Sequence, residues 1–143
     1  MSTIDLDALR KTRAENPGKI AEVLANRKRR ELLRGDGKLF IVAADHPARG
    51  ALGVGKNETA MADRNVLLER LALALSRPGV DGVLGTPDII EDLALLGLLD
   101  DKIVVGSMNR GGLKGASFEM DDRYTAYDVD GIVESGLDFA KNL

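Results

Sequence analysis

The stretch KLFIVAADHPARG, residues 38–50, decides the fold class of this chain. Five or six apolar residues run without alternation into Asp45-His46-Pro47, and such a run is typical of a strand buried on both faces of a parallel sheet. Pro47 lacks an N–H and disfavours a helical backbone at His46, so the strand is predicted to end near Asp45. The carboxyl end of such a strand is where α/β folds bind ligands. Asp45 and His46 are therefore candidate site residues, with a turn cap and an ordinary loop histidine as the alternatives.

Composition narrows the class of protein. The 143 residues are 44% hydrophobic and 30% charged, which fits one globular domain. Aromatic residues make up only 3%, so stacked recognition of nucleic-acid bases has little to work with. The absence of cysteine excludes disulfides, thiolate zinc sites and cysteine nucleophiles. With a net charge of −3 and neither a signal sequence nor an apolar run near ~20 residues, we expect a cytoplasmic protein that binds neither nucleic acid nor membrane.

Two helices are predicted before the first strand. Residues 4–15 form a short helix that Asn16-Pro17-Gly18 ends, and the next helix carries an apolar stripe from Ile20 to Leu33. The run Arg27-Lys28-Arg29-Arg30 is interpreted as a solvated face of this second helix, with phosphate binding as the weaker alternative. Residues 1–37 are thus taken as N-terminal helices and residues 38–143 as the remaining domain.

From Lys38 onward, strands alternate with helices. The predicted elements are a strand at 38–45, a helix at 61–76, a strand at 81–85, a helix that Thr86 caps and that runs to about Leu96 with Gly97 as its stop, and a strand at 102–108. A last helix, capped by Asp128, carries Ile132, Val133, Leu137 and Ala140 on one face. This alternation implies right-handed crossovers and a parallel sheet.

Three strands are too few for a complete parallel fold. A (β/α)₈ barrel takes about 250 residues, so three units amount to less than half of one. No fourth strand is predicted before the chain stops at Lys141-Asn142-Leu143. We therefore expect part of a larger fold, in which Val42, Val83 and Val105 are candidates for an inward face that lacks its far wall.

Three segments carry a family resemblance: IVAADHPARGALG (41–53), LGTPDIIEDL (84–93) and GSMNRGGLKGASFEMDDRYTAYD (106–128). They resemble an actinobacterial family of (β/α)₈ proteins related to deoxyribose-phosphate aldolases and to archaeal-type class I fructose-bisphosphate and tagatose-bisphosphate aldolases. The resemblance extends from about Ile20 to Lys141 and implies a partial TIM barrel, the N-terminal half of a protein about twice as long. The ending GLDFAKNL departs from the family's glycine-rich exit into a fourth strand.

The resemblance implies a class I mechanism, in which a lysine holds the substrate as a Schiff base. In this superfamily that lysine lies on the sixth strand, which is outside this chain, so residues 1–143 alone are expected to be inactive. The aspartate that ends the first strand matches Asp45, whose implied catalytic role is to hydrogen-bond a sugar hydroxyl or the Schiff-base region and to assist proton transfer. Lys141 is rejected as the Schiff-base lysine because it is expected to follow a helix.

Four further residues are candidates for substrate binding. His46 could bind a hydroxyl or a phosphate, and the guanidinium of Arg49 could meet a phosphate as a bidentate fork. Asn109 and Arg110 leave the third strand at the same mouth of the sheet.

The leading hypothesis is a cofactor-free aldolase-type lyase of carbohydrate catabolism, acting on a phosphorylated sugar or a polyol-derived sugar acid and assembling as a homo-oligomer. The first alternative is a non-catalytic half-barrel module. The second is a metal-dependent barrel enzyme with Asp45, His46 and another carboxylate as ligands. A single histidine speaks against this last reading, since catalytic zinc sites usually use two or three, and no metal is expected.

Overall fold

The computed structural model describes residues 4–109 and 124–142. Its elements are α1 (Leu6–Glu15), α2 (Gly18–Ala25), β1 (Ile41–Ala43), the 3₁₀ turn η1 (Pro47–Arg49), α3 (Arg64–Leu75), β2 (Gly82–Gly85), α4 (Pro87–Leu95), β3 (Ile103–Ser107), α5 (Val129–Glu134) and β4 (Phe139–Lys141). The chain is an α/β protein, as the alternating pattern predicts. In the described part, no helix has the length and apolar character to cross a membrane.

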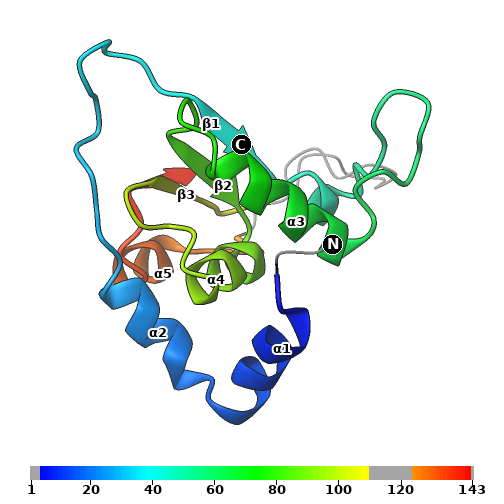
Figure 1. Cartoon of the computed structure of the whole chain (residues 1–143), viewed down its shortest axis with the longest axis horizontal. Helices are drawn as coiled ribbons and strands as arrows, with labels where there is room; N and C mark the ends of the chain where they lie inside the picture. Colours follow the sequence, from blue (N-terminus) through cyan, green and yellow to red (C-terminus); the bar gives the residue numbers. More distant parts are fainter. Residues whose placement is uncertain (1–3, 110–123, 143) are drawn as a thin grey trace.

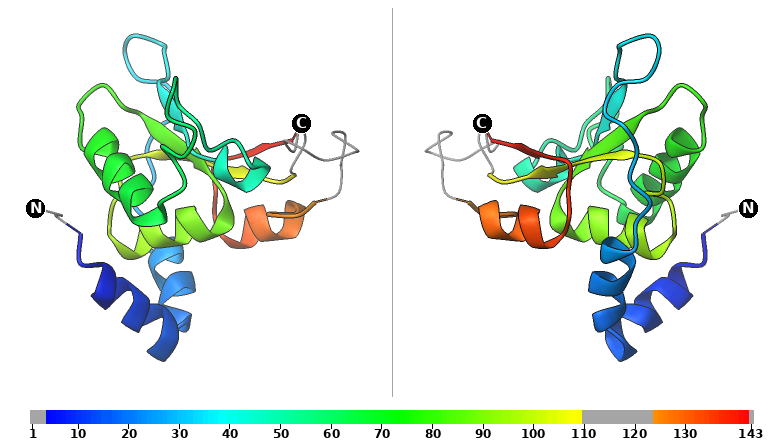
Figure 2. Two further views of the ribbon diagram at one scale, coloured as in Figure 1. Left: turned by 90° about the vertical axis from the view of Figure 1, so that its right-hand side faces the viewer. Right: turned by 90° about the vertical axis from the view of Figure 1, so that its left-hand side faces the viewer.

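The four strands form one parallel sheet in the order β1-β2-β3-β4. Helix α4 packs on β3 and α5 on β4, while α3 packs on α4, so these helices lie against one face of the sheet (Figures 1 and 2). Helix α2 packs on α4 from outside, and α1 packs on α2. The sequence order and parallel pairing are those of successive βαβ units, a connection that is right-handed in nearly all proteins.

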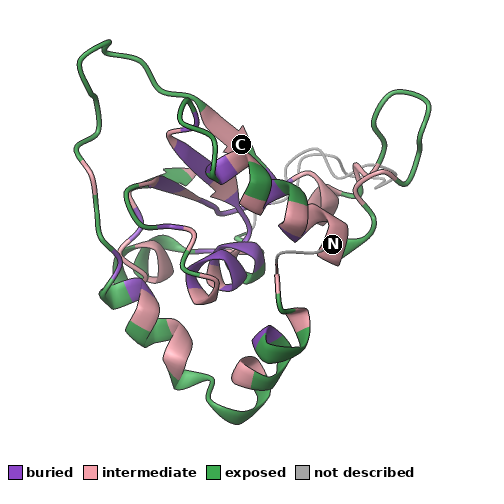
Figure 3. Cartoon of the chain, in the orientation of Figure 1, coloured by how far each residue is buried: buried purple, intermediate pink, exposed green. Residues whose placement is uncertain are grey.

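The core lies between the sheet and these helices, where Figure 3 shows the buried residues of β2, β3 and α4. Val83 and Val104 are neighbours in register and are 0% exposed. The row Ala43, Leu84, Val105 and Phe139 lies on the opposite face and is only half-buried or exposed. The predicted inward face was therefore wrong for Val42 and Val83, which share the helix-facing row.

Local sequence explains the ends of the helices. Asp63 caps α3 by accepting hydrogen bonds from the N–H groups of Asn65 and Val66, and Asp128 caps α5 by accepting one from Gly131 at 2.7 Å. Gly97 takes a left-handed φ of 69° just after α4, as expected for a glycine stop. The Asp128 cap and the Gly97 stop were predicted from the sequence. The Asp63 cap was not, since the helix predicted from residue 61 begins only at Arg64.

The segment before β1 differs from its prediction. Helix α2 ends at Ala25, and Leu32 and Leu33, the predicted end of its apolar stripe, are 44% and 50% exposed. The following residues run outside any helix or strand until Ile41, as the long excursion between α2 and β1 in Figure 1 shows. Strand β1 is shorter than predicted and is not buried on both faces: Ile41 and Val42 are half-buried and Ala43 is exposed in this edge strand of the described sheet. His46 has helical angles (φ −59°, ψ −42°) despite Pro47, because η1 begins there.

The basic run is not a solvated helix face. The side chain of Arg27 is 2% exposed and donates to Asp138 and to the carbonyl oxygens of Lys102 and Gly136. Arg30 donates to Asp81 at 2.7 Å. These arginines bind the amino ends of the strands, so their partners lie far away in sequence and no local pattern predicts them.

A fourth strand is present where none was predicted. Phe139–Lys141 pairs with β3 in parallel, with Ser107 opposite Lys141. Helix α5 ends at Glu134 because Gly136 takes a φ of 61°, so Leu137 and Ala140 do not share a helix face with Val133, which is 72% exposed. The ending GLDFAKNL is thus a strand entry, and the reason for rejecting Lys141 no longer holds.

Candidate functional site

The carboxyl ends of the strands bring one buried carboxylate and one amine together. Asp45 lies two residues beyond β1 and is 3% exposed. Its Oδ2 accepts a hydrogen bond of 2.6 Å from Nζ of Lys141, which ends β4, and a longer one of 3.4 Å from Oγ of Ser107, which ends β3. Asp45 therefore joins the mouths of three strands.

The charge state of Asp45 follows from these contacts. Burial alone would raise the pKa of its carboxyl group, since a desolvated carboxylate is costly. The hydrogen bond and the charge of Lys141 outweigh this effect, with smaller contributions from Arg49 and His46, and the pKa is lowered from its ordinary value of 3.8. Asp45 is therefore a carboxylate, able to accept hydrogen bonds, at neutral pH.

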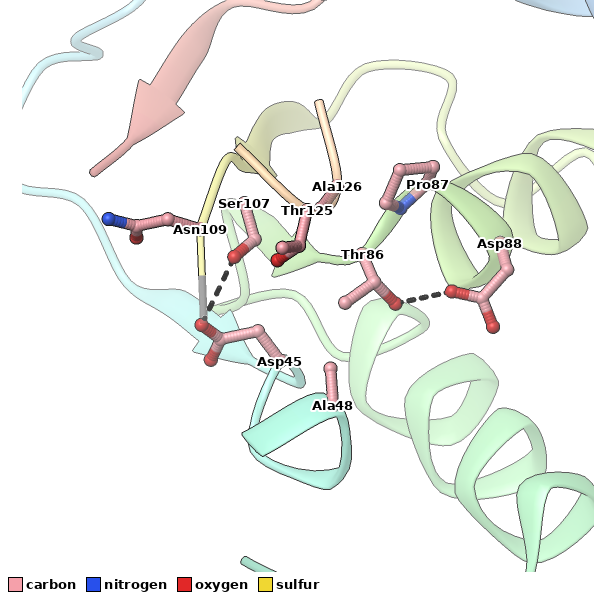
Figure 4. Close-up of a pocket in the computed structure, with 9 residues that line it drawn as sticks. All are labelled: Asp45, Ala48, Thr86, Pro87, Asp88, Ser107, Asn109, Thr125 and Ala126. Atoms are coloured by element: carbon pink, nitrogen blue, oxygen red, sulfur yellow. Dashed lines mark hydrogen bonds between the residues drawn. The ribbon is translucent and has the colours of Figure 1, made fainter. Parts of the chain in front are cut away.

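A cavity of about 280 Å³ opens beside Asp45 (Figure 4). Its lining combines carboxylate, hydroxyl and amide side chains with small apolar ones: Asp45, Ala48, Thr86, Pro87, Asp88, Ser107, Asn109, Thr125 and Ala126. No lysine or arginine is among these lining residues. Such a lining can exchange hydrogen bonds with several hydroxyl groups at once, which suits the hydroxylated part of a small polar molecule.

The far wall of the cavity is held by the start of α4. Oγ1 of Thr86 donates to Oδ1 of Asp88 at 2.5 Å, as Figure 4 shows, and the other carboxylate oxygen of Asp88 pairs with Arg64 of α3. Arg64 also pairs with Asp92, which is 2% exposed and accepts a second hydrogen bond from Arg13 of α1. This chain of ion pairs fixes α4, and with it Thr86 and Asp88, relative to the neighbouring helices.

The four substrate-binding residues predicted from the sequence differ in how closely they approach Asp45 and the cavity. Nδ1 of His46 is 3.8 Å from Oδ1 of Asp45, and the His46 side chain is 40% exposed. Arg49 lies in η1, with its Nε buried and without a hydrogen-bond partner in the described chain. Asn109 is 2% exposed, lines the cavity and forms a backbone bridge with Tyr124. Arg110 lies outside the described residues.

Sequence reasoning missed Thr86, Ser107 and Lys141 as members of the site. The sequence predicts Ser107 only as part of a strand and Thr86 only as a helix cap. The cap prediction is wrong for the side chain, because the Thr86 hydroxyl accepts no hydrogen bond from the helix backbone and donates to Asp88 instead. For Lys141, the available signal was Gly136 as a helix stop followed by a short apolar run, the same arrangement that precedes β2 and β3. Three residues are too few for a hydrophobic period to distinguish a strand from the end of a helix.

The metal hypothesis needs a cluster of ligands. Across residues 4–109 and 124–142, no three histidine, aspartate or glutamate side chains are grouped so that they could hold a metal ion.

Comparison with known proteins gives two results. The profile of the Cgl0159-like family matches residues 37–143. The crystal structure of Cgl0159 from Corynebacterium glutamicum superposes with a TM-score of 0.92 at 71% sequence identity, covering 98% of this chain and 48% of that one. The chain thus spans about half the length of that protein. A search of curated proteins found no match.

Proposed function

The chain belongs to the Cgl0159-like family, and from that premise we propose that it is the amino-terminal half of a (β/α)₈-barrel lyase of the class I aldolase type. Its substrate is a phosphorylated sugar or a polyol-derived sugar acid. The observation that carries the proposal is the buried carboxylate of Asp45, held by an amine at 2.6 Å beside a hydroxyl-lined cavity at the carboxyl ends of parallel strands. This is the edge at which barrel enzymes place their catalytic groups.

The curvature of the sheet supports the barrel. In a flat sheet, three inter-strand steps of about 4.8 Å would separate β1 from β4 by roughly 14 Å, more than an extended lysine and an aspartate can bridge. Asp45 and Lys141 nevertheless form a hydrogen bond across the two intervening strands, so the sheet curls toward the face that carries them. Half of a barrel requires a sheet that curls in this direction and whose outer strands, β1 and β4 in the described chain, each have one neighbour.

The chemistry assigns Asp45 to the proton transfers. In a class I retro-aldol reaction, a lysine amine condenses with the substrate carbonyl and water leaves. A base then takes the proton of the hydroxyl group beyond the bond to be cleaved, the carbon–carbon bond breaks, and its electrons remain in an enamine that is later protonated and hydrolysed. Asp45, as an ionised carboxylate, binds that hydroxyl and assists the transfer.

The two ends of the substrate meet different surroundings. The described cavity lining carries Asp45 and Asp88 and no cation, so it suits the neutral, hydroxylated part of the sugar. A phosphate or carboxylate would find no guanidinium or ammonium group in this lining, since Asp45 and Asp88 already hold Lys141 and Arg64. It would instead be bound near Arg49, outside this lining. The nucleophilic lysine belongs to the second half of the barrel, as the resemblance to class I aldolases implies.

The test is borohydride trapping in the full-length protein with candidate ketose phosphates and sugar acids. We expect retro-aldol cleavage, with irreversible inactivation only when substrate and borohydride are both present and an adduct on a lysine outside residues 1–143. Residues 1–143 alone should give neither cleavage nor adduct. Cleavage that a chelator abolishes would instead indicate metal-dependent chemistry, and a full-length protein that binds but cleaves none of these sugars would indicate a non-catalytic barrel.

A further inference from the structure

Four polar residues form one row across the carboxyl edge of the sheet. The register pairs Ala43 with Leu84 and Ser107 with Lys141. Two residues beyond Ala43 and Leu84 stand Asp45 and Thr86, and side chains two apart point to the same face. The row is therefore Asp45, Thr86, Ser107 and Lys141. It lies next to the partly exposed row that ends at Phe139, on the same face of the sheet and closer to the carboxyl ends of the strands. The first three of these line the cavity.

Lys141 occupies the end of this row and reaches back across it. Its side chain is 20% exposed, whereas that of Asp45 is 4% exposed. Its Nζ and Oγ of Ser107 both donate to Oδ2 of Asp45, and within the described chain no side-chain hydrogen bond to Oδ1 is present. One oxygen of the carboxylate is thus occupied by protein donors, which orients the group about its Cβ–Cγ bond.

We propose that Lys141 is a positioning residue, whose ammonium group holds the Asp45 carboxylate in one orientation beside the cavity so that its other oxygen can accept a substrate hydroxyl. This inference rests on the proposed function and adds to it a residue for which neither the sequence pattern nor the family match indicates a role. Thr86 and Ser107 complete the same row with hydroxyl groups that can bind neighbouring oxygens of a sugar.

The other charges around Asp45 do not replace Lys141. His46 and Arg49 follow Asp45 on its own segment, and neither has a nitrogen within hydrogen-bond distance of the Asp45 carboxylate among the described contacts. Ser107 of β3 is uncharged, and Asp88 of α4, the other carboxylate lining the cavity, is itself anionic beside Arg64. Lys141 is therefore the one described cation that hydrogen-bonds Asp45 directly.

The alternative is that the ion pair of Asp45 and Lys141 has only a structural role, linking the edge strands β1 and β4. That alternative predicts that loss of Lys141 lowers stability and leaves the chemistry of Asp45 in the folded protein unchanged. Positioning predicts instead that kcat of the folded full-length protein falls. Loss of the ammonium group raises the pKa of Asp45 under either reading, so the titration tests the contact itself and the kinetics separate the two roles. Because the pKa of Asp45 lies below 3.8, the ion pair stabilises the fold above that pH, and this contribution is lost as the pH falls through the lowered value.

The experiment is a carboxyl titration of the chain labelled with ¹³C-aspartate, followed by NMR. In the wild type we expect the midpoint of Asp45 below 3.8. In Lys141→Met the midpoint should move to 3.8 or above, because burial then acts unopposed, whereas Lys141→Arg should keep it low. The matched control is Lys102→Met, which removes a lysine at the opposite edge whose Nζ donates to the carbonyl of Val80 at 2.7 Å.

An unchanged midpoint in Lys141→Met would overturn the inference. So would a wild-type midpoint at or above 3.8, which decides the matter even if the methionine variant does not fold. In the full-length protein, Lys141→Met should lower kcat more than it raises KM and move the acid limb of the rate profile to higher pH. A borohydride adduct mapped to Lys141 would make it the nucleophile instead. Absence of retro-aldol activity, with the titration as expected, would refute only the proposed function.

Discussion

The carboxyl ends and the amino ends of the strands, called here the carboxyl edge and the amino edge of the sheet, both pair aspartates with cations, but in different surroundings. At the carboxyl edge, Asp45 meets Lys141 beside a cavity. At the amino edge, Asp138 accepts hydrogen bonds from Arg27, Arg29 and the N–H of Val104.

Asp81 repeats the arrangement at the amino edge. It accepts hydrogen bonds from Arg30 and from the N–H of Phe40. At the amino edge, each of these carboxylates binds an arginine and a backbone N–H group, and neither lines the cavity beside Asp45. The comparison teaches that a buried aspartate beside a cation becomes a functional candidate only where an open volume adjoins it.

The comparison is tested most strongly by Asp45→Asn in the full-length protein. Loss of a positioned acid/base group lowers kcat by about 10²–10⁴-fold, and we expect a fall in that range in the folded protein. The denaturation midpoint should fall less than in Asp138→Ala, because the partner left behind, Lys141, has a 20% exposed side chain that can reach water, whereas that of Arg27 is 2% exposed. Steady-state kinetics and chemical denaturation of the same preparation measure both. Wild-type turnover in Asp45→Asn would reduce Asp45 to a turn residue and remove the distinction between the edges.

At the amino edge, Asp138→Ala should show the opposite pattern. Removing it leaves Arg27 buried without its carboxylate, since the Arg27 side chain is 2% exposed. Loss of one partner of a buried pair costs about 3–5 kcal/mol, so the free energy of unfolding should fall by that order while kcat of the folded full-length protein is kept. If Asp138→Ala lost catalysis and kept its stability, the amino edge would be the functional one, against the proposal.

The smallest effect is expected from Arg29→Met. Arg29 shares Asp138 with Arg27, but its side chain is 59% exposed, and exposed ion pairs contribute about 0–1 kcal/mol. The denaturation midpoint should therefore hardly change, and added salt should remove any difference from the wild type. A change as large as that of Asp138→Ala would mean that the solvated arginine, rather than the buried one, secures this edge.

Sequence reasoning located what local patterns encode. The strands near 82 and 103, the cap of α5 at Asp128 and the stop at Gly97 follow from apolar runs, capping residues and glycine. The place of Asp45 at the mouth of the first strand follows from the apolar run and Pro47. Each of these signals lies within a few residues of the feature that it predicts.

What the sequence could not show depends on long-range contacts. Lys141 and Asp45 are 96 residues apart, and Arg30 and Asp81 are 51 apart. An isolated lysine or arginine carries no mark of the partner that it will meet, so the basic run looked solvated. Strand β4 was missed because its three residues follow a weak helix whose apolar spacing continues through Leu137 and Ala140.

The contact of Arg27 with Asp138 has a consequence for how the chain is made. The two residues are 111 positions apart, and the other acceptors of Arg27 are the carbonyls of Lys102 and Gly136. At about 5–20 residues per second, roughly 5–20 s of synthesis separate the appearance of the arginine from that of its aspartate. During that time the guanidinium of Arg27, which follows α2, has no carboxylate partner, so it stays hydrated until the segment that leads into β4 has been made.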